Sequence, residues 1–83
     1  MVASQMNYEV YILYSKKLDR YYVGQTENID LRLSVHNTRG KKYTSKGIPW
    51  ILIKSYKCNS RSEAVRLETK IKKRGIRRFI EDE

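Results

Sequence analysis

Cysteine and histidine are nearly absent from this chain of 83 residues, which contains one of each, Cys58 and His36. A disulfide needs two cysteines, and a structural zinc site built from cysteine and histidine needs several such ligands. The composition therefore excludes a disulfide framework and a zinc-stabilised domain. Cys58 lies beside a strand-like run, and we expect it to be a small apolar filler.

Long apolar runs are also missing. No window approaches the roughly 20 apolar residues of a membrane span, and residues 1–7 lack the basic and apolar regions of a signal peptide. We therefore expect a cytoplasmic protein without membrane contacts. The length suits a single modest core, and without repeats or linkers it predicts one domain over residues 1–83, with its core at 8–74.

Acidic residues are absent from Leu31 to Ser62, although the net charge of the chain is +9. Residues 1–36 carry four basic and four acidic side chains, so the whole excess lies beyond them. Such a stretch creates a positive field that suits a polyanion. We expect contact with nucleic acid, and the alternative is a solvated surface with counterions. The basic residues of the stretch are Arg32, Arg39, Lys41, Lys42, Lys46, Lys54, Lys57 and Arg61.

The pattern of apolar residues and turn signals predicts an α+β fold. Aromatic and β-branched runs favour strands, whereas capping residues mark helix ends. The expected elements are a hairpin of strands 8–14 and 20–24, a helix capped by Thr26 and running through Asn37, a strand at 50–56, and a helix from Ser60 to Gly75. The order is β-β-α-β-α, a three-stranded antiparallel sheet flanked by helices, and residues 76–80 are expected to add a short C-terminal helix.

The helix that begins after Ser60 carries an unexplained acid. Ala64, Val65, Leu67 and Ile71 define its apolar arc, and Glu68 falls near the centre of that arc at about 100° per residue. Glu63 forms a capping box with Ser60, which leaves only Glu68 without a structural reason. A buried charge without a partner is costly, so Glu68 needs an arginine, a lysine or a bound metal ion.

The first helix shows a similar anomaly. Arg32 and His36 are four residues apart, and they project within an apolar arc that we assign to Ile29, Leu31, Leu33 and Val35. One interpretation is that Arg32 pairs with Glu68 inside the core. The other is that two helices with inward polar groups line a cleft.

These residues resemble a known family. Glu9-Val10-Tyr11, ten intervening residues and then Tyr22-Val23-Gly24 are similar to the paired motif of the GIY-YIG nuclease superfamily. Arg32 on the following helix and Glu68 on the last one agree with the downstream pattern. The resemblance covers about residues 8–74, and it is greatest to small standalone bacterial members that consist of little beyond the catalytic domain.

The resemblance implies a role for each position. Tyr11 matches the tyrosine beside the nucleophilic water, assigned as or linked to the general base, and Tyr22 matches a tyrosine that positions water and phosphate. Arg32 matches the arginine that holds the scissile phosphate. Glu68 matches the sole protein carboxylate on one divalent ion, Mg²⁺ or Mn²⁺, and His36 a position that orients a tyrosine or phosphate.

The resemblance further implies a structure-selective or weakly specific endonuclease that hydrolyses DNA in repair or recombination. RNA remains an alternative substrate, and a protein partner is one source of specificity. No small-molecule cofactor is expected. Gly24 is expected to permit a close backbone approach. The basic loop is expected to contact the substrate through Arg39, Lys41, Lys42, Tyr43 and Lys46.

Three departures from the family pattern keep other functions open. Glu9 replaces a glycine, Gln25 stands where the repair members commonly have lysine, and no asparagine follows Asn59. One alternative is a catalytically weak module that only binds nucleic acid. A second is a scaffold that docks a partner protein through its basic loop.

Overall fold

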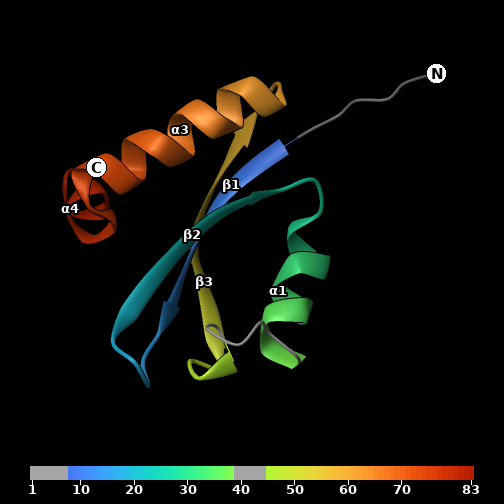
Figure 1. Ribbon diagram of the computed structural model, residues 1–83, viewed down its shortest axis with the longest axis vertical. Helices are drawn as coiled ribbons and strands as arrows, with labels where there is room; N and C mark the ends of the chain where they lie inside the picture. Colours follow the sequence, from blue (N-terminus) through green and yellow to red (C-terminus); the bar gives the residue numbers. More distant parts are fainter. Residues whose placement is uncertain (1–7, 39–44) are drawn as a thin grey trace.

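The computed structural model describes residues 8–38 and 45–83, and its centre is an antiparallel sheet (Figure 1). The strands are β1 (Tyr8–Ser15), β2 (Arg20–Thr26) and β3 (Trp50–Cys58), in the spatial order β2-β1-β3. The predicted three-stranded sheet is confirmed, and β2 and β3 each continue two residues beyond the predicted ends. One irregularity, between Ile12 and Leu13 of β1, leaves Ile53 of β3 unpaired.

Within the described ranges, the helices α1 (Ile29–Thr38), α3 (Arg61–Arg74) and α4 (Ile76–Glu81) accompany the sheet. Their order confirms the predicted β-β-α-β-α arrangement and the short helix at the C-terminus. In Figure 1, α3 and α1 lie on opposite sides of the sheet. Across the described ranges, no helix has both the length and the apolar character that crossing a membrane requires.

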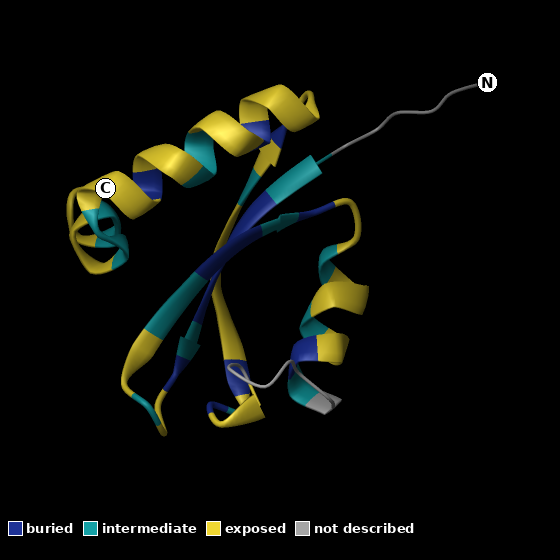
Figure 2. Cartoon of the chain, viewed as in Figure 1, coloured by how far each residue is buried: buried dark blue, intermediate teal, exposed yellow. Residues whose placement is uncertain are grey.

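One side of the sheet, which we call the aliphatic face, carries Val10, Ile12 and Val23. These side chains pack against Ala64 and Ile71 of α3, and all five are at most 4% exposed. Figure 2 shows these buried positions along the strands and on the inner side of α3. Burial of aliphatic side chains is the main stabilising contribution in a domain of this size.

The opposite side, which we call the aromatic face, carries Tyr11, Leu13 and Trp50. Each of them is at most 2% exposed, and Ile29 and Leu33 of α1 pack against them. Residues opposite each other in an antiparallel pair share a face. Gly24 and Tyr22, which pair with Tyr11 and Leu13, therefore belong to the aromatic face as well.

The start and the orientation of α1 differ from the prediction. Asn28, not Thr26, caps the helix, because its Oδ1 accepts the N–H of Leu31 at 3.0 Å. Thr26 ends β2, and its Oγ1 accepts the N–H of Asn28. The predicted apolar arc is wrong at two positions, since Leu31 and Val35 are 61% and 44% exposed. A spacing of two residues does not fit a helix, so only part of that set faces the sheet.

The predicted ends of α3 are confirmed. Ser60 is the N-cap, and its Oγ accepts the N–H of Glu63, whose own carboxylate accepts the N–H of Asn59. Gly75 ends the helix with φ of +98°, a conformation that favours glycine. The predicted apolar arc is wrong at Val65, which is 44% exposed.

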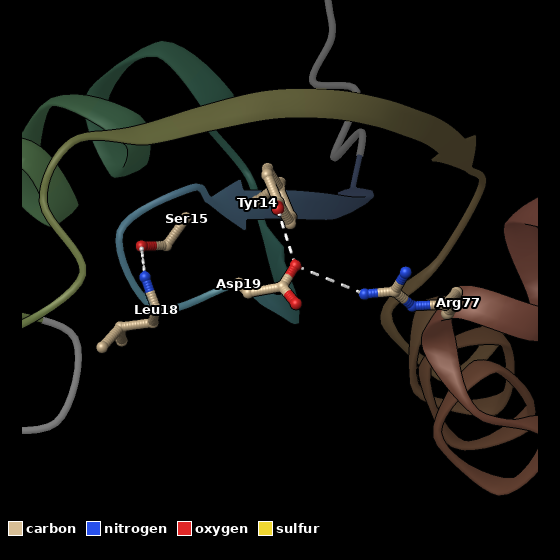
Figure 3. Close-up of polar contacts among 5 residues, drawn as sticks. All are labelled: Tyr14, Ser15, Leu18, Asp19 and Arg77. Atoms are coloured by element: carbon tan, nitrogen blue, oxygen red, sulfur yellow. Dashed lines mark hydrogen bonds and ion pairs between the residues drawn. The ribbon is translucent and has the colours of Figure 1, made fainter.

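Polar contacts connect the hairpin tip to α4. The Tyr14 hydroxyl donates to Oδ1 of Asp19 at 2.7 Å, and the Arg77 guanidinium of α4 lies 3.5 Å from the same oxygen (Figure 3). Within the turn, Oγ of Ser15 accepts the N–H of Leu18 at 3.1 Å. These contacts connect the β1–β2 turn to α4 on the surface of the domain.

Candidate active site

Tyr11 lies at the centre of the sheet, opposite Gly24. A Cβ atom at Gly24 would lie 2.6 Å from the Tyr11 hydroxyl oxygen and 2.8 Å from its Cζ. Real Cβ atoms do not approach other atoms so closely, so the aromatic side chain occupies the space that a glycine leaves. The two predicted motif residues thus form one packed unit.

Tyr22 and His36 complete an aromatic cluster around Tyr11. The Tyr11 hydroxyl lies 3.3 Å from Nε2 of His36, which α1 brings down onto the aromatic face and which is 6% exposed. The ring centroids of Tyr22 and His36 are 5.0 Å apart in an edge-to-face arrangement, and those of Tyr11 and Tyr22 are 6.4 Å apart. Three of the predicted site residues, from three different elements, therefore lie together.

The Tyr11 phenol is held in its neutral form. Burial, together with the neighbouring Tyr22, raises the pKa of Tyr11 to about 12. Arg32 lowers this pKa and Glu68 raises it, so both charges act on the phenol across the site.

Glu68 projects from α3 towards β2, and its side chain is 18% exposed. Gln25, which follows the second motif, donates from Nε2 to Oε1 of Glu68 at 3.2 Å. The ammonium of Lys72, one turn further along α3, lies 2.9 Å from Oε2. The cation paired with Glu68 in the described chain is therefore Lys72, and the interpretation in which Arg32 pairs with Glu68 inside the core is wrong.

Arg32 is exposed and lines a groove beside Gln25. The groove extends from Gln25 across the end of β2 to the start of α3, and Gln25 in turn contacts Glu68 outside the groove lining. A guanidinium at such a place can bind phosphate through parallel hydrogen bonds. The other residues of the groove are Tyr8, Thr26, Glu27, Asn28, Leu31 and Arg61.

A divalent ion would have one protein carboxylate here. Residues 8–38 and 45–83 contain no group of three or more His, Cys, Asp or Glu side chains that could hold a metal ion. Magnesium nevertheless often binds proteins through one or two carboxylates and completes its shell with water and substrate phosphate. Glu68, half-buried and oriented by the neutral amide of Gln25, fits that kind of site.

The structure describes only part of the predicted basic loop. Lys46 is exposed, and the adjacent Gly47 packs against Trp50. Four predicted nucleic-acid-binding residues lie outside the described residues: Arg39, Lys41, Lys42 and Tyr43.

Three residues of the site escaped the sequence-based prediction. Gln25 was considered only as a departure from the family pattern, yet it contacts Glu68. Lys72 lies four residues after Glu68, a helical spacing that could have identified the ion pair. The Asn37 side chain accepts the N–H of Trp50 at 2.6 Å and donates to its carbonyl at 3.0 Å, which fixes the end of α1 against β3.

Known proteins show the same domain. A family model described as the GIY-YIG catalytic domain matches residues 7–77. The chain is 39% identical over 64 residues to the UPF0213 protein SH2523 of Staphylococcus haemolyticus. The aligned region covers 76% of this chain and 77% of that protein. It is also 37% identical over 68 residues to the UPF0213 protein BH0048 of Halalkalibacterium halodurans, where the aligned region covers 81% of this chain and 71% of that protein.

A solved structure agrees with the fold. The solution NMR structure of the UPF0213 protein BH0048 from Bacillus halodurans superimposes with a TM-score of 0.57 at 34% sequence identity. The match covers 92% of this chain and 81% of the other.

Proposed function

The chain belongs to the GIY-YIG family, and we propose that it is a divalent-metal-dependent endonuclease that hydrolyses phosphodiester bonds of DNA. The observation that carries the proposal is the cluster of Tyr11, Tyr22 and His36 on the aromatic face, within electrostatic reach of Arg32 and Glu68. Phenol, imidazole, guanidinium and carboxylate groups are those that hydrolysis of a charged phosphodiester requires.

The proposed reaction adds water across one P–O ester bond. The oxygen of the water bonds to phosphorus, the ester oxygen leaves, and the two protons of the water are shared between the leaving oxygen and the base. Tyr11, oriented by His36, is the proposed general base in its phenolate form, which the positive charges of Arg32 and of a bound divalent ion would favour. Tyr22 positions the water and the phosphate. Arg32 binds the phosphate oxygens from the groove and stabilises their growing negative charge.

Glu68 is the proposed ligand of a single Mg²⁺ or Mn²⁺ ion. When bound, the ion supplies a Lewis acid for a phosphate oxygen and positive charge for the departing oxygen. Gln25 orients Glu68 from β2 by donating to Oε1 of the carboxylate. No small organic cofactor enters the proposal.

The exposed basic surface supports DNA as the substrate. Basic side chains that reach solvent from α3 include Arg61 and Lys70. With a net charge of +9, the protein attracts a phosphate backbone without reading its bases. We propose selection by the shape of the DNA, for repair or recombination, with sequence specificity supplied by a protein partner where it is needed.

Cleavage assays over branched and linear DNA, with RNA alongside, test the proposal. We expect nicking that depends on Mg²⁺ or Mn²⁺ and that falls at least about 100-fold in Glu68→Ala and Arg32→Ala. Glu81→Ala and Arg66→Ala remove the same charges from exposed positions and serve as matched controls. If both site variants cut like the parent protein, the assignment is wrong.

A second candidate is a binding module of the same fold that does not cut. The Lys72 ammonium on Glu68 and the lack of an asparagine after Asn59 favour it. This candidate predicts DNA binding that weakens steeply with salt and no metal-dependent cleavage of any substrate in the panel.

A further inference from the structure

The two oxygens of the Glu68 carboxylate have different kinds of partner. Oε1 accepts a hydrogen bond from the neutral Gln25 amide at 3.2 Å, whereas Oε2 forms an ion pair with Lys72 at 2.9 Å. The Glu68 side chain is 18% exposed and the Lys72 side chain 60% exposed. The contact with Gln25 therefore comes from a strand of the sheet, whereas the contact with Lys72 comes from a side chain that is largely exposed to solvent.

The two contacts also differ in how easily they break. Gln25 is a β2 residue opposite Val10, next to the aliphatic core, so its amide is held by the sheet. Lys72 approaches from the same helix as Glu68, and exposed pairs at this spacing contribute only about 0.3–0.5 kcal/mol. A cation that binds Glu68 thus meets little resistance at Oε2, provided that it displaces the ammonium.

We propose that Lys72 occupies the metal-binding oxygen of Glu68 in the free protein, so that the ion and the DNA bind cooperatively. The inference rests on the proposed function and adds a regulatory step to it. Without DNA, the Lys72 ammonium neutralises Oε2 and competes with a divalent ion. When a DNA phosphate approaches Glu68, the solvent-exposed ammonium of Lys72 exchanges its carboxylate partner for the phosphate and leaves Oε2 to the ion.

Cooperativity follows because both ligands favour the same arrangement of Lys72. A ligand that releases the ammonium from Glu68 removes the competitor of the other ligand, and the coupling must be equal in both directions. The arrangement would also limit metal binding by the free protein, so that cleavage competence develops on the substrate.

The test is a Mn²⁺ titration followed by electron paramagnetic resonance of the free ion. Every protein in this titration also carries Tyr11→Phe, which blocks the proposed chemistry without altering a charge. Each protein is titrated with and without a short DNA duplex. Lys72→Gln is compared with Lys73→Gln, which removes the same charge from an exposed neighbour on α3. Glu68→Gln shows which part of the Mn²⁺ binding depends on the Glu68 carboxylate.

We expect Lys72→Gln to tighten Mn²⁺ binding without DNA by about fivefold, and Lys73→Gln by less than about twofold, because only the first removes a direct competitor. DNA should tighten Mn²⁺ binding in the parent and in Lys73→Gln, and clearly less in Lys72→Gln. Equal affinities and equal DNA effects in the two lysine variants would overturn the inference.

Cleavage by the protein without the Tyr11 substitution separates this failure from that of the proposed function. If the parent cleaves DNA in a metal-dependent way but Lys72→Gln and Lys73→Gln have equal Mn²⁺ affinities and equal DNA effects, only the role of Lys72 is overturned. A parent that neither cuts DNA nor binds Mn²⁺ through Glu68, with or without DNA, overturns both the inference and the proposed function.

Discussion

The two faces of the sheet use the same three strands for different purposes. The aliphatic face is closed by α3 with side chains that are all nearly inaccessible to water. The aromatic face is closed by the shorter α1, and its buried cluster includes the Tyr11 hydroxyl and the His36 imidazole, which contact each other. The aliphatic core and the cluster of Tyr11, Tyr22 and His36 thus lie on opposite sides of one sheet, while Glu68 belongs to α3, the helix that closes the aliphatic face.

The comparison shows how a small domain can bury polar groups. Each polar side chain in an apolar site costs free energy unless it finds a partner. On the aromatic face the phenol and the imidazole are partners of each other, while on the side of α3 the polar pair of Gln25 and Glu68 lies next to an otherwise aliphatic core. The aliphatic face can therefore carry most of the folding free energy, and the aromatic face can keep groups suited to catalysis.

The sharpest test of this division removes one oxygen from the aromatic face. We expect Tyr11→Phe to lower the cleavage rate by about 10²–10⁴-fold, the range typical of a lost general base. The free energy of unfolding should change by about 1 kcal/mol or less, since the ring stays in place and one hydrogen bond is lost. Urea denaturation and single-turnover cleavage measure the two effects.

The pH dependence adds a signature specific to the phenol. Because burial raises the pKa of Tyr11 to about 12, the phenolate fraction grows about tenfold per pH unit at neutral pH. The cleavage rate should rise with that slope from about pH 7 to 9 in the parent and be flat in Tyr11→Phe. Tyr14→Phe, which removes a phenol that contacts Asp19, should keep the slope of the parent.

The converse experiment acts on the aliphatic face. Ile71→Ala empties a fully buried position, and we expect the free energy of unfolding to fall by about 2–5 kcal/mol. Val65→Ala on the same helix serves as control, because Val65 is 44% exposed and should cost about 0.5 kcal/mol or less. The folded fraction of Ile71→Ala should cut DNA at the parent rate. Equal losses of stability in the two variants would contradict the assigned core.

The local signals of the sequence predicted most of this architecture. Ser60 and Gly75 mark the ends of α3 because capping depends on residues close in the chain. The cap of α1 was assigned to Thr26 instead of Asn28 because both offer a side-chain oxygen within two residues of each other. Local chemistry alone does not decide between such neighbours.

The contacts within the site depend on tertiary structure and were predicted less completely. The motif residues Tyr11, Tyr22 and His36 were selected by their resemblance to a family, and the structure brings them together. Gln25 and Glu68 are 43 positions apart, and no pattern in the sequence couples them. Their contact exists only because α3 crosses the end of β2.

Substitutions at two glycines should have effects of intermediate size, and they test whether the aromatic face depends on the packing of Gly24 against Tyr11. Gly24→Ala places a Cβ against the Tyr11 ring, so we expect a loss of about 1–3 kcal/mol in unfolding free energy together with a large loss of cleavage. Gly75→Ala has open space but an unfavourable φ of +98°, and it should lose about 1–2 kcal/mol while the folded protein still cuts. Comparable cleavage losses in both variants would mean that Gly24 does not act through Tyr11.

The smallest expected effect concerns α4, which reaches the hairpin by surface contacts. Arg77 lies 3.5 Å from Asp19 and 5.3 Å from the ring centre of Tyr21, and both Arg77 and Asp19 are largely exposed. Exposed pairs of these kinds contribute little, so Arg77→Ala should lower the free energy of unfolding by about 0.5–1 kcal/mol. The loss should shrink in high salt, which screens the ion pair. Arg78→Ala, an exposed neighbour, is the matched control. Ile76, Phe79 and Ile80 of α4 pack against the aliphatic core independently of Arg77, so the attachment of α4 should largely survive the substitution. A loss above about 2 kcal/mol, measured by urea denaturation, would contradict the surface role assigned to Arg77.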